Sequence, residues 1–239
     1  MWPERVLVFD ISGPVGHFRK PYSPMSPVTY PFPPPTAVFG IIGAICGYGK
    51  DEYLDRINAA EIAVGIRLLR PMRKFRAALN LLNTKGKAER NYFRPTGKSP
   101  RIQIPHEFLR DPAFRIYFAS HSDGLMTDLR EMLETGCTAY TPCLGLSECI
   151  AQVQFAGEHD VEPISVEEPV EICTVLSAED AGVRYDPGGR YQRVRVSARM
   201  EQDRTVTRYT EVVVETEARP IRASPPSAFD CDGDTICFV

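Results

Sequence analysis

The chain has 239 residues, 43% of them hydrophobic and 25% charged, and a net charge of −3. This is ordinary globular composition and excludes an intrinsically disordered protein. The longest weakly polar run, residues 37–49, is shorter than the ~18 to 20 apolar residues that cross a bilayer, so we expect neither a transmembrane helix nor a membrane partner. Because the N-terminus lacks the basic start and long apolar core of a secretory signal, we expect a cytoplasmic protein.

The first elements are a strand, a proline-rich loop and a buried helix. Residues 5–12 are rich in β-branched and aromatic side chains, which predicts a strand. Residues 13–35 contain eight prolines and exclude regular helix or a central strand. Residues 36–46 are apolar between a proline and a glycine, which predicts a helix. The glycines of residues 40–49 match no phosphate-binding loop, and we expect them to allow close packing of this helix on a sheet.

A short helix over residues 51–60 and a strand over residues 61–69 come next. Residues 73–80 and 100–105 could then form two arms around a tip at residues 83–98, which describes a projecting hairpin.

The hairpin region is strongly basic. Residues 67–101 hold eleven lysines and arginines against one acid, a net charge of +10, while the rest of the chain is at −13. Tyr92 and Phe93 lie among these basic residues. Cations for phosphates and aromatic rings for base stacking are how proteins hold single-stranded nucleic acid. This segment therefore predicts RNA or DNA binding.

The remaining elements complete an α+β pattern. Residues 114–120 and 150–155 read as strands around a helix over 124–135, which Gly136 ends. The order β, α, β, basic insertion, β, α, β matches a ferredoxin-like sheet. A small all-β continuation follows, with strands expected at residues 170–176, 191–200 and 205–215. We expect two units, a ferredoxin-like domain over residues 1–155 with the insertion at about 70–105, and a C-terminal β extension over 156–239.

Metal or cofactor chemistry has little support. Cys137, Cys143 and Cys149 are evenly spaced, but five-residue gaps are not the usual zinc spacing and no histidine lies close in sequence. The aspartates at 230, 232 and 234 do not fit a calcium loop and predict a turn between strands. We expect no metal and no cofactor.

His17 is the histidine with the strongest catalytic context. It follows the first strand, where a base could meet an RNA 2′-hydroxyl, with Lys20 to stabilise charge and Tyr22 or Tyr48 as a further group. The alternative is that His17, Arg19 and Lys20 contact phosphate or a neighbouring subunit.

Three phrases resemble the CRISPR-associated "Cas five" family of repeat-associated (RAMP) proteins, with the type I-B branch most similar. They are Gly-His-Phe-Arg-Lys-Pro (16–21), Phe-Pro-Pro-Pro-Thr-Ala-Val-Phe-Gly-Ile-Ile-Gly-Ala (32–44) and Pro-Cys-Leu-Gly-Leu-Ser-Glu-Cys (142–149). The resemblance implies an antiviral Cascade subunit whose ferredoxin-like domain and basic hairpin "thumb" cap the 5′ handle of CRISPR RNA. It also implies contacts with the large and backbone subunits, and leaves contact with target DNA open.

By position, the thumb is the basic segment, with Tyr92 or Phe93 stacking on a base and Arg19 and Lys20 lining the sheet side. The residues expected to meet phosphates are Arg73, Lys74, Arg76, Lys85, Lys87, Arg90, Arg94, Lys98 and Arg101. Residues 131–183 carry eleven acids and no lysine or arginine, and are expected to face protein partners or solvent.

Two alternatives stay open. In the type I-C branch of the family the protein itself cuts repeat RNA without a metal, and here only His17 and Lys20 are candidates for that reaction. A structural scaffold that binds protein but no RNA is the other alternative.

Overall fold

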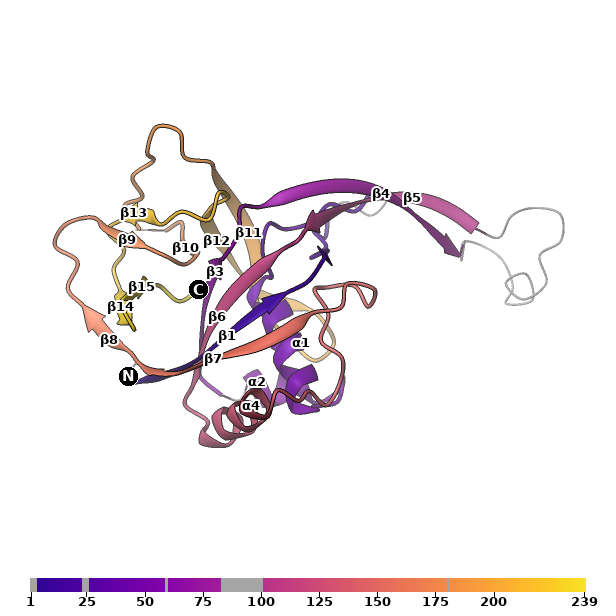
Figure 1. Ribbon diagram of the computed structural model, residues 1–239, viewed down its shortest axis with the longest axis horizontal. Coiled ribbons are helices and arrows are strands. Elements are labelled where there is room, and N and C mark those ends of the chain that lie inside the picture. Colours follow the sequence, from indigo (N-terminus) through magenta and orange to yellow (C-terminus); the bar gives the residue numbers. More distant parts are fainter. Residues whose placement is uncertain (1–3, 23–25, 59, 83–100, 180) are drawn as a thin grey trace.

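The computed structural model describes residues 4–22, 26–58, 60–82, 101–179 and 181–239. Every strand pairing between described elements is antiparallel. Figure 1 shows a body of sheets and helices from which one two-stranded hairpin projects. The elements are β1 (Arg5–Ser12), β2 (Val15–Gly16), α1 (Pro35–Cys46), α2 (Tyr53–Asn58), β3 (Ile62–Leu68), β4 (Arg73–Leu82), β5 (Arg101–Arg110), β6 (Ala113–Ser120), α4 (Asp123–Thr135), β7 (Gln152–Asp160), β8 (Glu162–Ile164), β9 (Val170–Ile172), β10 (Leu176–Ser177), β11 (Tyr191–Met200), β12 (Val206–Glu215), β13 (Ile221–Ala223), β14 (Ala228–Cys231) and β15 (Asp234–Ile236).

The central sheet has the order β3-β6-β1-β7. Its strand β1 is apolar on both faces because both faces are covered. Leu7, Phe9 and Ile11 belong to the main core with the helices, whereas Val6 and Val8 belong to a second cluster with the C-terminal strands. The continuous apolar run of β1 therefore follows from a sheet packed between two layers.

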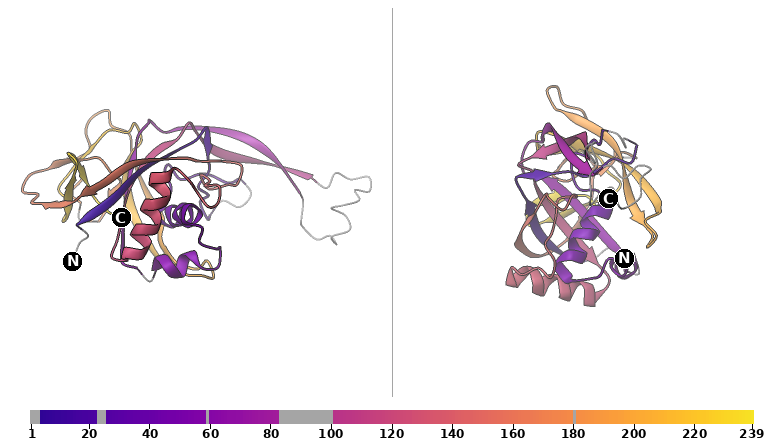
Figure 2. Two further views of the ribbon diagram at one scale, coloured as in Figure 1. Left: turned by 60° about the horizontal axis from the view of Figure 1, so that its bottom comes forward. Right: turned by 90° about the vertical axis from the view of Figure 1, so that its right-hand side faces the viewer.

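Helices α1, α2 and α4 lie together on one side of the sheet (Figure 2). Helix α1 begins at Pro35 and ends before Gly47, whose φ of 80° is in the left-handed region. A Cβ at Gly43 would lie 2.9 Å from Cβ of Tyr53. This glycine therefore allows α2 to pack closely on α1, whereas the sequence predicted close packing of α1 on the sheet. The reason is that the short loop between the two helices returns α2 onto α1.

Helix α4 follows its predicted pattern closely. Ser122 caps it by accepting a hydrogen bond from the Leu125 amide at 3.4 Å. Leu125, Leu129 and Leu133 form the buried stripe, and Gly136, with φ of 65°, ends the helix.

Strands β14 and β15 of the C-terminal half pack on the other side of the sheet, whereas the longer strands β11 and β12 contribute valines to the main core with the helices. Residues 170–176 form two strands and not the single predicted one. The chain between them bonds elsewhere, since the Thr174 hydroxyl donates to the Cys237 carbonyl at 2.9 Å and Val175 N–H donates to the Ile66 carbonyl at 2.7 Å. The aspartates at 230 and 234 lie on β14 and β15 around a turn, as predicted.

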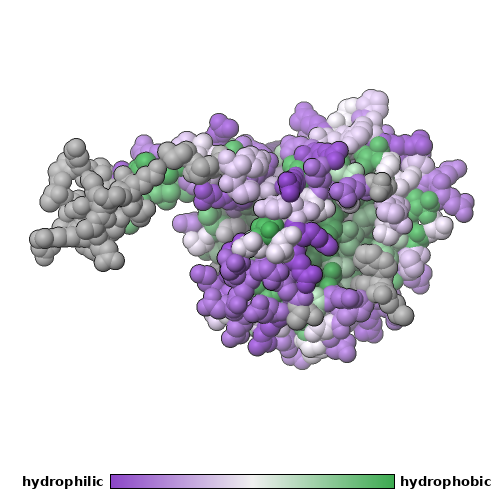
Figure 3. Space-filling model, turned by 180° about the vertical axis from the view of Figure 1, so that it is seen from behind, coloured by the Kyte–Doolittle hydropathy of each residue, from purple (hydrophilic) through white to green (hydrophobic). Residues whose placement is uncertain are grey.

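The other predicted strands and helices lie within a few residues of their predicted bounds, and the short strands β2, β8 and β13 are additions that the sequence did not predict. The proline-rich segment begins with β2, which pairs with the edge of β5. None of the described helices is both long and apolar enough to cross a bilayer. Seen from behind, the body has a hydrophobic hollow between hydrophilic rims, with the hairpin projecting beside it (Figure 3).

Candidate nucleic-acid interface

The hairpin of β4 and β5 has one apolar and one polar face, because side chains alternate along each strand. Phe75 stacks on Phe108 with ring centroids 5.5 Å apart. Together with Ala77 and Leu79 these rings pack against the main core. The apolar face therefore anchors the base of the hairpin to the body, and the polar face is exposed except near that base, where Leu109 is buried.

The polar face carries Arg76 and Arg101, both exposed. Arg73 is exposed as well, and lies opposite Arg110 at the base of the hairpin. Exposed guanidinium groups keep most of their hydration until a ligand arrives, so these three side chains are accessible to an anion such as a phosphate.

Lys74 is bound within the protein. Its ammonium donates to Glu107 Oε1 at 2.9 Å and to the Thr29 carbonyl at 3.3 Å. Burial raises the pKa of the Glu107 carboxyl, but the hydrogen bond and charge of Lys74 outweigh burial and hold that pKa below its usual value. Lys74 thus neutralises Glu107 and offers less charge to a ligand than its sequence position indicates.

Seven predicted residues lie outside the described part of the chain, namely Lys85, Lys87, Arg90, Tyr92, Phe93, Arg94 and Lys98.

The loop after β2 brings Arg19 and Lys20 to the body beside the hairpin. An isolated bridge pairs Arg19 with Thr29, and Lys20 N–H donates to the Val28 carbonyl at 3.0 Å. The Lys20 ammonium lies 5.3 Å from the centre of the Tyr30 ring and 5.8 Å from that of Tyr22. The Tyr22 side chain is 71% exposed. This loop therefore presents a cation next to an open aromatic face.

A cavity of about 440 Å³ opens beside this loop. Its walls are the proline-rich loop, the start of α1 and the β11–β12 hairpin, where the hydroxyl oxygens of Thr36 and Ser197 are 2.6 Å apart. Arg204 lies 4.9 Å above the ring of Tyr53. The arginines and tyrosines that line the cavity are Arg19, Tyr30, Tyr53, Arg204 and Tyr209.

Sequence reasoning missed Tyr53, Arg204 and Tyr209, because they come from α2 and a distant hairpin. The available signal was the density of arginine and tyrosine in residues 190–209. Just outside the cavity, Arg195 lies 4.5 Å from the centre of the Tyr209 ring. These contacts leave flat ring faces and guanidinium groups side by side, which suits stacking on a base and binding of a phosphate.

His17 lines the same cavity but is only 1% exposed. Its Nδ1 lies 2.6 Å from the Glu107 carbonyl, so Nδ1 carries the proton. Burial lowers the pKa of His17, and the bond to that carbonyl opposes burial only in part. The neutral ring leaves Nε2 as an acceptor, and among the described residues this buried atom has no hydrogen-bond partner. A ligand in the cavity that donates a hydrogen bond would satisfy it.

The candidate catalytic groups are not assembled around an open substrate position. His17 is enclosed, and the Lys20 ammonium is directed at the tyrosine rings. The Tyr48 hydroxyl donates to Asp128 Oδ2 at 2.7 Å, and burial together with this bond raises its pKa. Tyr22 alone is open to solvent.

The predicted acidic stretch is mostly at the surface. Of its acids that the structure describes, Glu158 is partly buried between Arg5 and Arg130, at 3.2 Å from each. The exposed ones are Glu131, Glu134, Glu148, Asp160, Glu162, Glu167, Glu168, Glu171 and Glu179. These carboxylates give β7, β8 and β9 a sign of charge opposite to that of the hairpin.

One family model matches most of this chain, and solved structures share its fold. The family model described as "CRISPR-associated protein (Cas_Cas5)" matches residues 6–221. No curated protein matches. A CRISPR protein from Archaeoglobus fulgidus is similar in structure, with a TM-score of 0.57, 13% identity, and coverage of 97% of this chain and 98% of that one. A chain of a structure titled "CRISPR RNA-guided surveillance complex" has a TM-score of 0.57, 17% identity, and coverage of 90% and 91%.

Proposed function

This chain belongs to the Cas five (Cas5) family of CRISPR-associated proteins, and from that premise we propose that it is the non-catalytic RNA-binding subunit of an antiviral surveillance complex. In this proposal it caps the 5′ repeat-derived handle of CRISPR RNA in a type I-B Cascade. One observation carries the proposal: the arginine–tyrosine cavity lies next to the hairpin that holds the exposed arginines. His17 joins the two, since it lines the cavity and is hydrogen-bonded to β5 of the hairpin.

The finer fold assignment is part of the proposal. The order β3-β6-β1-β7 with antiparallel neighbours is the order of a ferredoxin-like βαββαβ sheet, which supports that fold. In this proposal the β4–β5 hairpin is the base of the thumb. We keep the division at residue 155 as a proposal, although Val196, Val212 and Val214 of β11 and β12 pack in the main core with β1.

The RNA path follows from charge and shape. Phosphates would lie along the polar face of β4 and β5, near Arg76 and Arg101, and continue over the basic residues between the two strands. A splayed base would enter the cavity and stack on Tyr209 or Tyr53, while Arg19 and Arg204 bind the flanking phosphates. A base amino group or a ribose hydroxyl would donate to His17 Nε2.

Protein partners would meet the side of opposite charge. The exposed acids of residues 131–183 repel RNA, so the large and backbone subunits of the complex are proposed to contact this part of the chain. Target DNA would reach the protein only through the assembled complex.

The runner-up, a metal-independent endoribonuclease, has less support. A general base must come within hydrogen-bond reach of the 2′-hydroxyl, or one water away from it, in the bound complex. His17 is enclosed and holds a neutral ring, and Lys20 is held over tyrosine rings. A nuclease therefore requires the proline-rich loop to open. Binding to the exposed arginines does not, and only the hydrogen bond to His17 Nε2 needs the same opening.

The test uses one tube and two gels. The full chain is mixed with end-labelled RNA that contains the host repeat, first without metal and then with Mg²⁺. The proposal predicts retention on a native gel and intact RNA on a denaturing gel. A single metal-independent cut that His17→Ala abolishes would replace it with the nuclease. No retention at ~0.15 M salt would favour the scaffold.

A further inference from the structure

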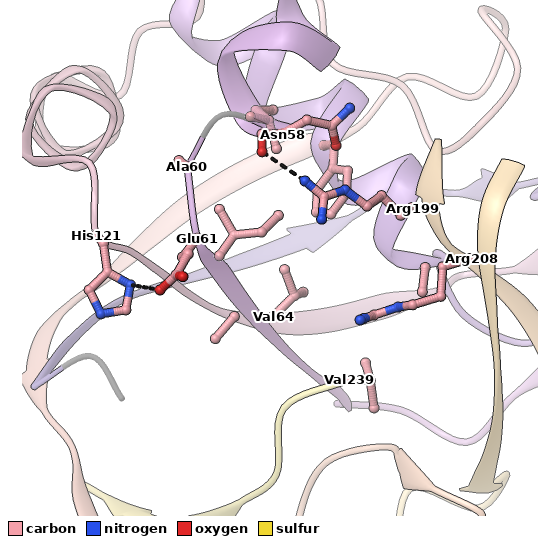
Figure 4. Close-up of a pocket in the computed structure, with 13 residues that line it drawn as sticks. Asn58, Ala60, Glu61, Val64, His121, Arg199, Arg208 and Val239 are labelled. Atoms are coloured by element: carbon pink, nitrogen blue, oxygen red, sulfur yellow. Dashed lines mark hydrogen bonds and ion pairs between the residues drawn. The ribbon is translucent and has the colours of Figure 1, made fainter. Parts of the chain in front are cut away.

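A second cavity, of about 410 Å³, lies between β3 and the β11–β12 hairpin (Figure 4). Residues 60–64 form one wall, so the cavity follows the start of β3 along its length. Arg199 and Arg208 stand on the other wall, and Val239 closes one end. The floor is apolar, with Phe39 and Ile57 among its residues. The hairpin of β4 and β5 takes no part in this cavity.

The wall at β3 is a strand edge with main-chain groups that point into the cavity. His121 N–H donates to the Glu61 carbonyl at 3.0 Å, so Glu61 is bonded toward β6. The direction of the main-chain hydrogen bonds alternates along an antiparallel strand. The amide and carbonyl groups of Ile62, Val64 and Ile66 therefore point to the outer edge of β3. Two of these outer carbonyls are already used, since Val64 accepts from Val239 N–H at 3.0 Å and Ile66 accepts from Val175 N–H at 2.7 Å.

Ile62 is the next outward position, and it faces the cavity. No strand of the described residues pairs with this edge, because β3 is the last strand of its sheet. Its amide and carbonyl therefore offer one donor and one acceptor to an incoming segment. Unpaired strand edges of this kind are where extended peptides add to sheets.

The opposite wall concentrates positive charge in an unfavourable way. Arg199 and Arg208 are direct cross-strand partners in the β11–β12 register, and like charges in that position repel. Arg199 donates to the Asn58 carbonyl at 2.8 Å, while Arg208 forms no ion pair with any described residue. A carboxylate between the two guanidinium groups would relieve this repulsion.

The far end of the cavity carries a negative charge instead. There Glu61 Oε2 lies 3.3 Å from His121 Nδ1, and the Glu61 side chain is 84% exposed. A nucleic-acid strand along the cavity would bring its phosphates close to this carboxylate. A peptide with one acidic side chain avoids that repulsion and uses the Ile62 main chain as well.

We propose that this cavity binds an extended segment of a partner protein, which adds a strand to the outer edge of β3 and places an aspartate or glutamate between Arg199 and Arg208. The proposal goes beyond RNA capping and does not depend on it, because none of the residues that would hold the peptide belongs to the RNA-binding residues proposed above.

The test selects peptides against the full-length protein from a random heptapeptide library. Enriched peptides are expected to share one acidic residue with β-branched or other apolar residues two positions away, and to lack proline at the pairing position. A selected peptide is then synthesised, and its affinity is measured by fluorescence polarisation. On binding, hydrogen exchange at the Ile62 amide is expected to slow, a readout that a purely ionic contact would not give.

Arg208→Glu is the decisive variant. It replaces a repelling cross-strand pair with an attracting one, so the thermal unfolding midpoint is not expected to fall. Peptide affinity is expected to fall about tenfold to a hundredfold, as for the loss of a charge-assisted hydrogen bond. A lysine in place of the acidic residue of the peptide should restore binding to this variant. Arg222→Glu, on the exposed face of β13, is the matched control and should leave affinity unchanged.

Any of the following results would overturn the proposal. One is a selection without an acidic pattern. Another is equal binding to Arg208→Glu, or binding that leaves the Ile62 amide exchange unchanged. The last is concentration-dependent dimerisation that Arg208→Glu abolishes, which would assign the cavity to a second copy of this chain.

Discussion

Removal of two arginines from the polar face of the hairpin should weaken RNA binding by a calculable amount. Arg76→Ala and Arg101→Ala take away one exposed cation each, and neither side chain belongs to the buried core. Each phosphate contact contributes about 0.7 to the slope of log affinity against log salt for a single strand. The double variant should therefore lower the slope by about 1.4.

The same slope sets the expected loss of affinity. Scaled from 1 M to ~0.15 M salt, each contact is worth about fourfold, so the pair should weaken binding about 14-fold. The assay is fluorescence polarisation of a labelled repeat RNA, titrated at four salt concentrations. Arg184→Ala with Arg222→Ala is the matched control, because it removes the same charge from exposed positions near β13, at the other end of the molecule (Figure 1).

The two variants are compared at equal unfolding midpoints. Equal salt slopes for the hairpin variant and wild type would refute the prediction, because the hairpin would then make no phosphate contacts. An equal loss of affinity in the control would also refute it, because binding would then depend on net charge alone.

Three further predictions concern stability and charge. Gly43→Ala should lower the free energy of unfolding by about 1 to 3 kcal/mol in chemical denaturation, since its Cβ would lie 2.9 Å from a tyrosine of α2. Gly124→Ala has open space around it in α4 and should raise that free energy by about 0.5 to 1 kcal/mol. Equal effects of the two variants would contradict the packing of α1 on α2. Because burial lowers the pKa of His17, the folded protein resists protonation of this ring, so the free energy of unfolding should fall as pH drops below ~6.5. In His17→Asn the free energy of unfolding, measured by denaturation at a series of pH values, should change less over that range. Glu107→Gln frees Lys74 from its ion pair, and we expect about 1 kcal/mol lower stability with tighter RNA binding; weaker binding would assign Glu107 a direct role.

The sequence was most informative where a local pattern decides the structure. The leucines of α4 and the stop at Gly136 predict that helix without help from the rest of the chain, and the structure adds a cap at Ser122. The apolar run of β1 likewise predicts a buried strand. The two arms of the hairpin follow from alternation on β4 and β5, although both strands run farther than predicted.

The cavity beside the proline-rich loop could not be predicted in the same way. Tyr53 and Arg204 are separated by about 150 residues, and only the fold brings the Arg204 guanidinium to 4.9 Å from the centre of the Tyr53 ring. His17 is a similar case, since its burial and its bond to Glu107 depend on β5. Lys74 shows the converse, because a basic residue in a basic segment is already bound to an internal carboxylate.

The central claim is that RNA lies along the hairpin and enters the arginine–tyrosine cavity. The most direct measurement is photo-crosslinking of repeat RNA that carries a photoreactive base in the 5′ handle, with the crosslinked peptides identified by mass spectrometry. If RNA follows this path, crosslinks form to peptides that contain Tyr22, Tyr53 or Tyr209 and to the hairpin. Crosslinks confined to the acidic surface of β7, β8 and β9, or no crosslinks above background, would contradict it.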